Sequence, residues 1–291
     1  MAPAFQDDKA PICIPFILEQ LQAHQEAHRK AAQLQRPSSS VQPPQDGVAA
    51  RPLPPLMIGL NGMQGVGKTT LVAALAGALE ARGVRTLVCS VDDFYLTHGD
   101  QRALAEAHPD NALVQHRGSL RAKLTGVIAK GTHDVALAVS VVDALAQGLP
   151  THIPHYDKAA FNGQGDRQPP PPGHPRTLRN HALEHLLFIN ERLRAYDALT
   201  DRLGAFVHVD SEDVEYVYAW RLEQEEALRR ERGDPAAGMT PEQVVRFVDG
   251  YFPGYELYTD GVRHGVLPGR PGCQLRMVVG RDRKVKDVIR I

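Results

Sequence analysis

The sequence predicts an α/β protein in which helices cover both faces of a mainly parallel sheet. Short apolar runs that suit buried strands alternate with segments of helical periodicity, as in residues 56–91. The order strand, loop, helix, strand in that region is typical of parallel pairing, because the intervening helix carries the chain back along the sheet. With 291 residues, of which 43% are hydrophobic, the chain can bury a sizeable core.

The beginning of the chain is expected to form a separate helical segment. Residues 13–35 place apolar side chains at helical spacing in the first turns and polar ones in the second half. Residues 36–55 are rich in Pro and Ser and predict a linker. We therefore divide the chain into an N-terminal helical segment at 1–35, a linker at 36–55 and a main domain at 56–291.

The first strand and helix of the main domain enclose a glycine-rich loop. "LMIGLN" predicts a buried strand, and residues 67–83 predict a helix that Gly83 ends. The sequence between them, "GMQGVGKT", fits the P-loop pattern G-x-x-x-x-G-K-S/T. In a P-loop, backbone N–H groups converge on phosphates at the positive end of a helix. An ordinary glycine-rich turn is the alternative, but strand, spacing, Lys, Thr and helix all agree with a phosphate site.

The P-loop pattern assigns specific parts to its side chains. We expect Lys68 to pair with the β- and γ-phosphates of a nucleotide, and the Thr69 hydroxyl to bind Mg²⁺. The predicted nucleotide-binding residues are Gly62, Met63, Gln64, Gly65, Val66, Gly67, Lys68, Thr69 and Thr70.

Two adjacent carboxylates follow the next predicted strand. Residues 84–91 read as that strand, and Asp92 and Asp93 stand in "SVDDFY" at its end. Ligands of open parallel sheets lie beyond the carboxyl ends of the strands. A carboxylate there suits a general base that orients a hydroxyl for attack on the γ-phosphate. A helix N-cap or a solvated turn is an equally good interpretation of the spacing alone.

The rest of the chain continues the alternation of helices and strands. We expect helices at 133–148, 177–199, 214–231 and 240–262, a third strand at 205–210, and a strand, a turn and a further strand within 274–291. Residues 151–176 form a long polar loop, and loops of this length in compact domains are usually functional or disordered.

Composition excludes several classes of protein. A formal net charge of −1 gives no general attraction to nucleic acid or to an anionic membrane. No apolar run approaches the roughly 18 residues that a membrane span needs. The three cysteines are odd in number and far apart, which fits a reducing cytosol better than a disulfide framework. We therefore expect a cytoplasmic protein, with a nuclear or organellar location left open.

The P-loop together with "SVDDFY" resembles the phosphoribulokinase, uridine kinase and pantothenate kinase group of P-loop kinases. Further motifs, among them "GTHDVALA", "VYAWRLEQEEALR" and "VVGRDRKV", resemble the D-glycerate 3-kinase-like branch of fungi and plants across most of residues 56–291. The resemblance implies a three-layer P-loop NTPase fold, ATP, Mg²⁺ and a small hydroxylated acceptor.

The resemblance also implies parts for individual residues. Asp92 would act on the acceptor hydroxyl as the base, beside Lys68, and Arg221 would be a lid arginine that stabilises charge on the transferred group. For Arg221 the alternative is a surface salt-bridge helix, and for the 151–176 loop it is a solvated loop. The implied acceptor-binding residues are Asp93, Tyr95, His133, Tyr156, Lys158 and Arg167.

The chain departs from the family pattern at two places. Residues 119–130 separate "RG" from "GTHD", which the family keeps nearly adjacent. After "GDR" the family carries a strand with an acidic end that helps to hold Mg²⁺, whereas this chain goes from residue 176 straight into a helical segment. We therefore expect one central strand to be missing. A gene model with a retained intron and a skipped exon, a splice form and a decayed paralogue each explain the departures.

Two functions from different classes follow. One is a kinase that transfers the γ-phosphate of ATP to a hydroxyl of a small, glycerate-like metabolite. The alternative is a non-catalytic or impaired nucleotide-binding protein that keeps the P-loop. The intact Lys68, Thr69 and Asp92 favour the kinase, and the missing strand favours the alternative. The identity of the acceptor and the oligomeric state cannot be read from the sequence.

Overall fold

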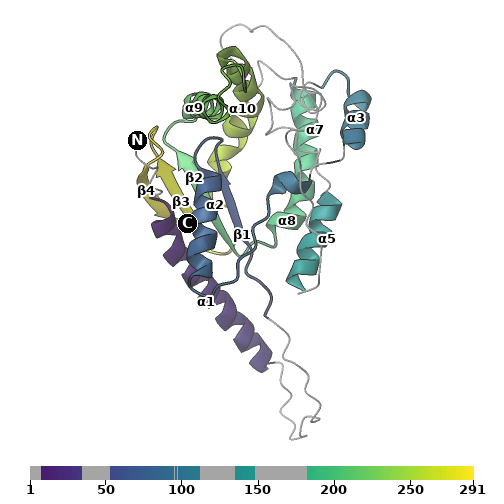
Figure 1. The fold of residues 1–291 in the computed structure, drawn as a ribbon. Helices are drawn as coiled ribbons and strands as arrows, with labels where there is room; N and C mark the ends of the chain where they lie inside the picture. The colour runs from purple at the N-terminus through teal and green to yellow at the C-terminus, as the bar shows by residue number, and fades with distance from the viewer. Residues whose placement is uncertain (1–7, 35–52, 95, 97, 112–134, 148–181) are drawn as a thin grey trace, which may run out of the picture.

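The computed structural model describes residues 8–34, 53–94, 96, 98–111, 135–147 and 182–291. Its sheet has the strand order β1-β2-β3-β4 (Figure 1). The strands are β1 Ile58–Gly62, β2 Ala205–Ser211, β3 Gln274–Val279 and β4 Val285–Arg290. The first three are parallel and β4 is antiparallel to β3. The predicted α/β fold with a mainly parallel sheet is confirmed.

Helices flank the sheet along the described chain. They are α1 Ala10–Leu34, α2 Lys68–Glu80, α3 His98–Ala107, α5 Val135–Ala146, α7 Leu183–Leu193, α8 Asp197–Thr200, α9 Tyr216–Arg232 and α10 Pro241–His264, with 3-10 helices η1 Val91–Phe94 and η3 Arg194–Tyr196. The prediction of one helix over 177–199 was partly wrong: α7 ends at Leu193, and a 3-10 turn separates it from the short α8.

Helices contact both faces of the sheet. Successive side chains of a strand point to opposite faces. On one face, Cys13 of α1 lies with its Sγ 3.8 Å from the Sδ of Met277 in β3. On the other face, Arg263 of α10 is ion-paired with Asp210 of β2. The sheet is therefore the middle one of three layers.

The N-terminal helix packs into this layered core. Cys13, Phe16 and Ile17 of α1 belong to the main hydrophobic cluster, together with Leu71 and Leu75 of α2. The second half of α1 is mostly exposed, as its polar sequence predicts. Whether 36–55 divides the chain into domains stays a prediction, because residues 35–52 lie outside the described part.

A polar cluster lies between α10 and the sheet. The buried carboxylate of Asp210 accepts hydrogen bonds from Arg263 and Arg276. Burial alone would raise the pKa of Asp210, but the hydrogen bonds from the two arginines hold it below its ordinary value. His208, two residues earlier in β2, is buried and its Nδ1 has no partner among the described residues. Burial, opposed by Asp210 and assisted by Arg276 and Arg263, lowers the pKa of His208 to about 4.

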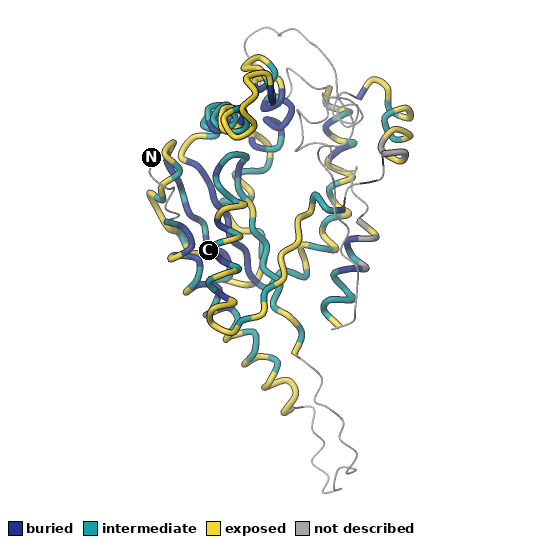
Figure 2. The backbone as a smooth tube through the Cα atoms, in the orientation of Figure 1, coloured by how far each residue is buried: buried dark blue, intermediate teal, exposed yellow. Residues whose placement is uncertain are grey.

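The predicted second strand, residues 84–91, is not a strand in the structure. Residues 84–90 have no regular structure and Val91 begins η1. Leu87, Val88 and Val91 are 59%, 54% and 54% exposed, and the segment is mostly yellow in Figure 2. β1 stands at the edge of the four-stranded sheet. A strand exists only where a neighbour pairs with it, and within the described residues no strand lies on the outer side of β1. The segment therefore has the apolar sequence of a strand but is not part of the sheet.

Two findings bear on the class of protein. No helix in the described part of the chain has both the length and the apolar character needed to cross a membrane. Cys13, Cys89 and Cys273 are all free thiols.

The buried histidine predicts a specific dependence of stability on pH. Its pKa is about 4 in the folded chain against an ordinary 6.5, so the unfolded chain binds more protons between these values. The free energy of unfolding should fall by about 3 kcal/mol as the pH drops through this window. Asp210 acts in a different window, below its ordinary pKa of 3.8.

Urea unfolding at several pH values between 4 and 7 checks this expectation. His208→Gln should flatten the slope in this window, whereas the control His264→Gln, which changes an exposed histidine, should keep it. An unchanged slope in His208→Gln would contradict the assignment.

Candidate nucleotide-binding and catalytic site

The loop between β1 and α2 is the segment predicted to bind phosphate. β1 ends at Gly62 and α2 begins at Lys68. Gly65 and Gly67 have φ of 76° and 98°, a backbone conformation that side chains with a Cβ rarely adopt. A Cβ on Gly67 would meet no atom within 4 Å, so the loop is open at this point. The first N–H groups of a helix have no intrahelical partner and carry partial positive charge.

The loop holds its lysine closely. Lys68 Nζ donates hydrogen bonds to the carbonyl oxygens of Gly62, at 2.7 Å, and of Met63, at 2.8 Å. Its ammonium therefore lies against the start of the loop. Thr69 and Thr70 follow in the first turn of α2 and are exposed. The strand–loop–helix arrangement predicted for residues 56–83 is confirmed.

Two buried side chains of the loop pack in the main hydrophobic core. Met63 and Val66 are buried in the main core. Ser211, at the end of β2, donates from Oγ to the Sδ of Met63 at 3.1 Å. Tyr255 of α10 is also in this core, and burial raises the pKa of its hydroxyl, which lies beside the backbone of Gln64. The aromatic side chains of α10 thus support the loop by packing.

The helix α9 packs directly on the loop. A Cβ on Gly65 would lie 2.6 Å from the Cβ of Trp220, which is closer than two such atoms ever approach. Trp220 is fully buried, and its Nε1 donates to the carbonyl of Arg281 at 2.7 Å. The glycine at position 65 is therefore required by its conformation and by its neighbour.

Arg221, the predicted lid arginine, follows Trp220 on α9. Its guanidinium pairs with Glu225 and lies 4.6 Å from the centre of the Phe247 ring. Glu225 is buried and also accepts the backbone N–H of Met239. Arg221 Nε is buried without a partner in the described part of the chain. The arginine is thus held in a partly buried network next to the loop, and its part in phosphate transfer stays a prediction.

The two aspartates of η1 differ in their contacts. Asp93 accepts the backbone N–H of Ser90 with Oδ2 at 3.0 Å, so its carboxylate holds the turn together. Asp92 donates its backbone N–H to the Ser90 hydroxyl at 3.2 Å. The contact of Asp93 thus agrees with the alternative interpretation, in which this carboxylate stabilises a turn. The catalytic assignment of Asp92 remains untested.

The other acceptor-binding candidates cannot be placed. Tyr95, His133, Tyr156, Lys158 and Arg167 all lie outside the described residues.

The described residues offer little for a metal ion besides Thr69. Asp210 lies on β2, the strand beside β1, but Arg263, Arg276 and the N–H of Ser211 occupy its oxygens. In the part of the chain that the structure describes, no three His, Cys, Asp or Glu side chains gather as a metal site would require. The residues of the loop fit a nucleotide phosphate, and Thr69 fits one position on its Mg²⁺.

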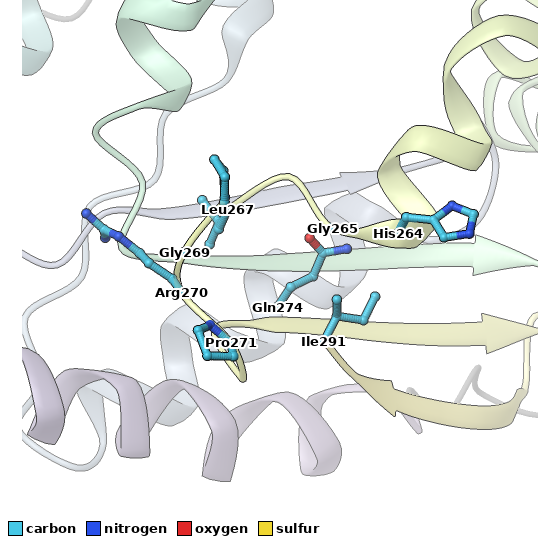
Figure 3. Close-up of a pocket in the computed structure, with 9 residues that line it drawn as sticks. His264, Gly265, Leu267, Gly269, Arg270, Pro271, Gln274 and Ile291 are labelled. Carbon is cyan, nitrogen blue, oxygen red and sulfur yellow. The ribbon is translucent and has the colours of Figure 1, made fainter.

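A pocket of about 300 Å³ lies near the start of β3 (Figure 3), at the opposite end of the parallel strands from the phosphate loop. It is lined by the end of α10, by the start of β3 and by Ile291. The side chain of Gln274 donates to Val262 O and accepts from Val266 N. Its polar atoms are therefore bonded to the backbone around the end of α10. This pocket is separate from the phosphate loop.

Sequence reasoning missed the contacts that hold the loop from outside. The packing of Trp220 on Gly65 was not foreseen. Arg283 of the β3–β4 turn donates from Nε to Gly65 O at 2.7 Å, across 218 positions of the chain. The local sequence around Arg283 contains no pattern that predicts a hydrogen bond to so distant a carbonyl.

The loop geometry predicts a difference between two glycines. Gly65 and Gly83 have nearly equal φ, 76° and 74°, but only Gly65 faces another residue. Gly83→Ala should cost roughly 1–2 kcal/mol of stability from backbone strain alone and should leave nucleotide affinity unchanged. Gly65→Ala should cost more, because Trp220 must move, and should also weaken ATP binding.

Thermal unfolding and calorimetric ATP titration of the two variants check this difference. Equal effects of the two substitutions on both quantities would contradict the packing of α9 on the loop.

The chain is similar in sequence to several known kinases. No protein-family model matches the chain. The chain is 33% identical over 262 residues to the uncharacterized kinase mug58 of Schizosaccharomyces pombe, a match that covers 79% of this chain and 89% of that protein. It is 35% identical over 232 residues to the chloroplastic D-glycerate 3-kinase of Arabidopsis thaliana, covering 71% of this chain and 48% of that protein. This chain thus spans about half of the plant enzyme's length.

A solved structure has a similar fold over nearly the whole chain. The D-glycerate 3-kinase from Cryptococcus neoformans var. grubii superposes with a TM-score of 0.74 at 28% identity, covering 98% of this chain and 100% of that one. Sequence and fold therefore agree. The chain belongs to the D-glycerate 3-kinase-like family of P-loop kinases of fungi and plants.

Proposed function

We propose that the chain transfers the γ-phosphate of ATP to a hydroxyl of a small acid, with D-glycerate as the first candidate. The observation that carries this proposal is the β1–loop–α2 unit with Lys68 held inside the loop, in a chain that belongs to a kinase family. D-glycerate is the substrate named for the plant relative and for the solved structure. Mg²⁺ bound with the nucleotide supplies positive charge to its phosphates.

The residues of the site divide the work as follows. Backbone N–H groups between Gly62 and Thr70 bind the phosphates, and the ammonium of Lys68 neutralises their charge. The hydroxyl of Thr69 holds the metal. Asp92 takes the proton of the acceptor hydroxyl, as the resemblance to the kinase family implies, and the carboxylate of Asp93 accepts the Ser90 N–H. Arg221 stabilises charge on the group in transfer.

Binding of the acceptor is assigned to the residues that the family resemblance implies. Asp93, which follows Asp92 directly, is one of these residues. The remaining proposed contacts to the acceptor are Tyr95, His133, Tyr156, Lys158 and Arg167.

The open edge of the sheet supports a second candidate function, a nucleotide-binding protein with little or no phosphate transfer. P-loop enzymes usually hold Mg²⁺ with the P-loop Ser or Thr and an acidic residue. Here β1 is an edge strand, and the acid on β2, Asp210, is bonded to two arginines. The metal would then have Thr69 alone among these groups, and the chain would bind ATP more weakly than relatives with a complete sheet.

Product formation distinguishes the two functions. The purified chain is incubated with MgATP and D-glycerate, and phosphorylated product is measured by mass spectrometry. A kinase forms phosphoglycerate in a saturable way that Lys68→Ala abolishes. The second candidate binds ATP in a way that depends on Lys68 but yields no phosphorylated acid.

We place the protein in the cytoplasm, with no nucleic-acid or membrane partner. The three free thiols fit a reducing compartment, and the net charge of −1 gives no general attraction to polyanions.

Lys68→Ala should weaken ATP binding by at least about tenfold, because a charge-assisted contact to phosphate is lost. The matched control is Lys286→Ala, which removes the same charge from an exposed position on β4. Isothermal titration with MgATP measures both. Equal affinities of Lys68→Ala and the wild type would rule out the loop as the phosphate site.

Asp92→Asn should lower kcat by roughly 10²–10⁴ with little change in ATP affinity, the usual contribution of a general base. Asp93→Asn is the control with the same loss of charge one residue away, and we expect a smaller loss of kcat from it. Steady-state kinetics with D-glycerate compare the two. A larger loss in Asp93→Asn would reverse the assignment.

A further inference from the structure

The turn between β3 and β4 reaches the phosphate loop from the end of the chain. Arg283 in this turn donates from Nε to the carbonyl oxygen of Gly65 at 2.7 Å. Its guanidinium also lies 5.4 Å from the centre of the Trp220 ring and pairs with Glu223 at 2.6 Å. One side chain, only 19% exposed, thus joins the loop to helix α9.

The backbone of the turn is fixed so that Arg283 points at the loop. Among the described residues other than glycine, Arg283 alone has a positive φ, of 62°. Such a conformation is unfavourable for a residue with a Cβ and persists where its surroundings determine it. Here Arg283 N donates to Gly280 O at 2.9 Å, and the preceding carbonyl of Arg281 accepts from Trp220.

Two residues just before the N-terminal helix, Asp8 and Lys9, also contact this turn. Lys9, which is 1% exposed, donates from Nζ to the carbonyl of Arg283 at 2.6 Å. Asp8 accepts the N–H of Val285 at 2.8 Å. The turn is therefore held by the residues just before α1 as well as by α9.

We propose that Arg283 is a positioning residue for nucleotide binding. In a trans peptide the carbonyl of Gly65 and the N–H of Val66 point in opposite directions. Arg283 binds that carbonyl from outside, and the N–H of Val66 is thereby directed inward, where it makes only a long 3.4 Å contact to Met63 O. Because the inward N–H groups serve phosphates, this positioning role rests on the proposed function.

The same contacts couple the loop to Arg221. Trp220 contacts both the Arg283 guanidinium and Gly65, and Arg221 follows it on α9. A loop that changes shape on binding phosphate must therefore move against Trp220 and Arg283. Arg283 is not assigned any contact with substrate.

Calorimetric titration with MgATP tests the proposal, with all variants at a temperature where circular dichroism shows them folded. Arg283→Ala should weaken affinity by roughly tenfold, the usual effect of losing a hydrogen bond from a charged group. Arg281→Ala is the control, because it removes an exposed charge from the same turn and keeps the carbonyl that Trp220 uses. It should stay within about twofold of the wild type.

Rescue by a conservative variant separates positioning from general support. In Arg283→Lys the ammonium can bond Gly65 O but cannot also lie over Trp220 and fork to Glu223. Its affinity should fall between those of the wild type and Arg283→Ala. A merely structural role would lower the melting temperature and leave the affinity of the folded variants unchanged.

Three outcomes would overturn the proposal: Arg283→Ala within twofold of the wild type, an equal loss in Arg281→Ala, or, if Arg283→Ala does not fold, wild-type affinity in Arg283→Lys. Lys68→Ala in the same series separates this inference from the proposed function. If the wild type does not bind ATP, or Lys68→Ala binds as tightly, the proposed function fails and the inference fails with it. If Lys68→Ala loses binding and Arg283→Ala does not, only the inference fails.

Discussion

The packing of helix α9 on the phosphate loop is the contact on which the rest of the site depends. Trp220 lies so close to Gly65 that no side chain fits between them, and the same tryptophan bonds the β3–β4 turn. Arg283 of this turn donates to the loop carbonyl of Gly65, and the carbonyl of Arg283 accepts from Lys9, just before α1. Segments from both ends of the chain therefore meet at this turn.

The open edge of the sheet is the second constraint. Among the described residues β1 pairs only with β2, and residues 84–90, which carry exposed apolar side chains, do not join the sheet. The η1 turn that follows packs through Phe94 on Ala138 and Val141 of α5, in a cluster separate from the main core. The phosphate loop is thus fixed by the main core, whereas Asp92 and Asp93 depend on a smaller one. The residues proposed for phosphate binding and those proposed for phosphate transfer accordingly rest on different parts of the fold.

Local patterns predicted the parts of this fold that local chemistry decides. The strand, loop and helix around Lys68 follow from residue types that are close together in the sequence. Helices α9 and α10 follow from their periodicity. The segment 84–91 has the composition of a strand but forms none, because pairing depends on a partner from elsewhere in the chain. The hydrogen bond between Arg283 and Gly65 depends on the three-dimensional fold in the same way. So do the ion pairs of Asp210 with Arg263 and Arg276.

The central claim is that the loop at Gly62–Thr69 is the nucleotide site and that α9 and the β3–β4 turn hold it in shape. A crystal structure with a non-hydrolysable ATP analogue and Mg²⁺ tests this most directly. The account predicts the β-phosphate among the loop N–H groups beside Lys68, with the Gly65 carbonyl still bonded to Arg283. An analogue bound elsewhere, for example in the pocket beside Gln274, or bound in a loop that has broken from Arg283, would contradict it.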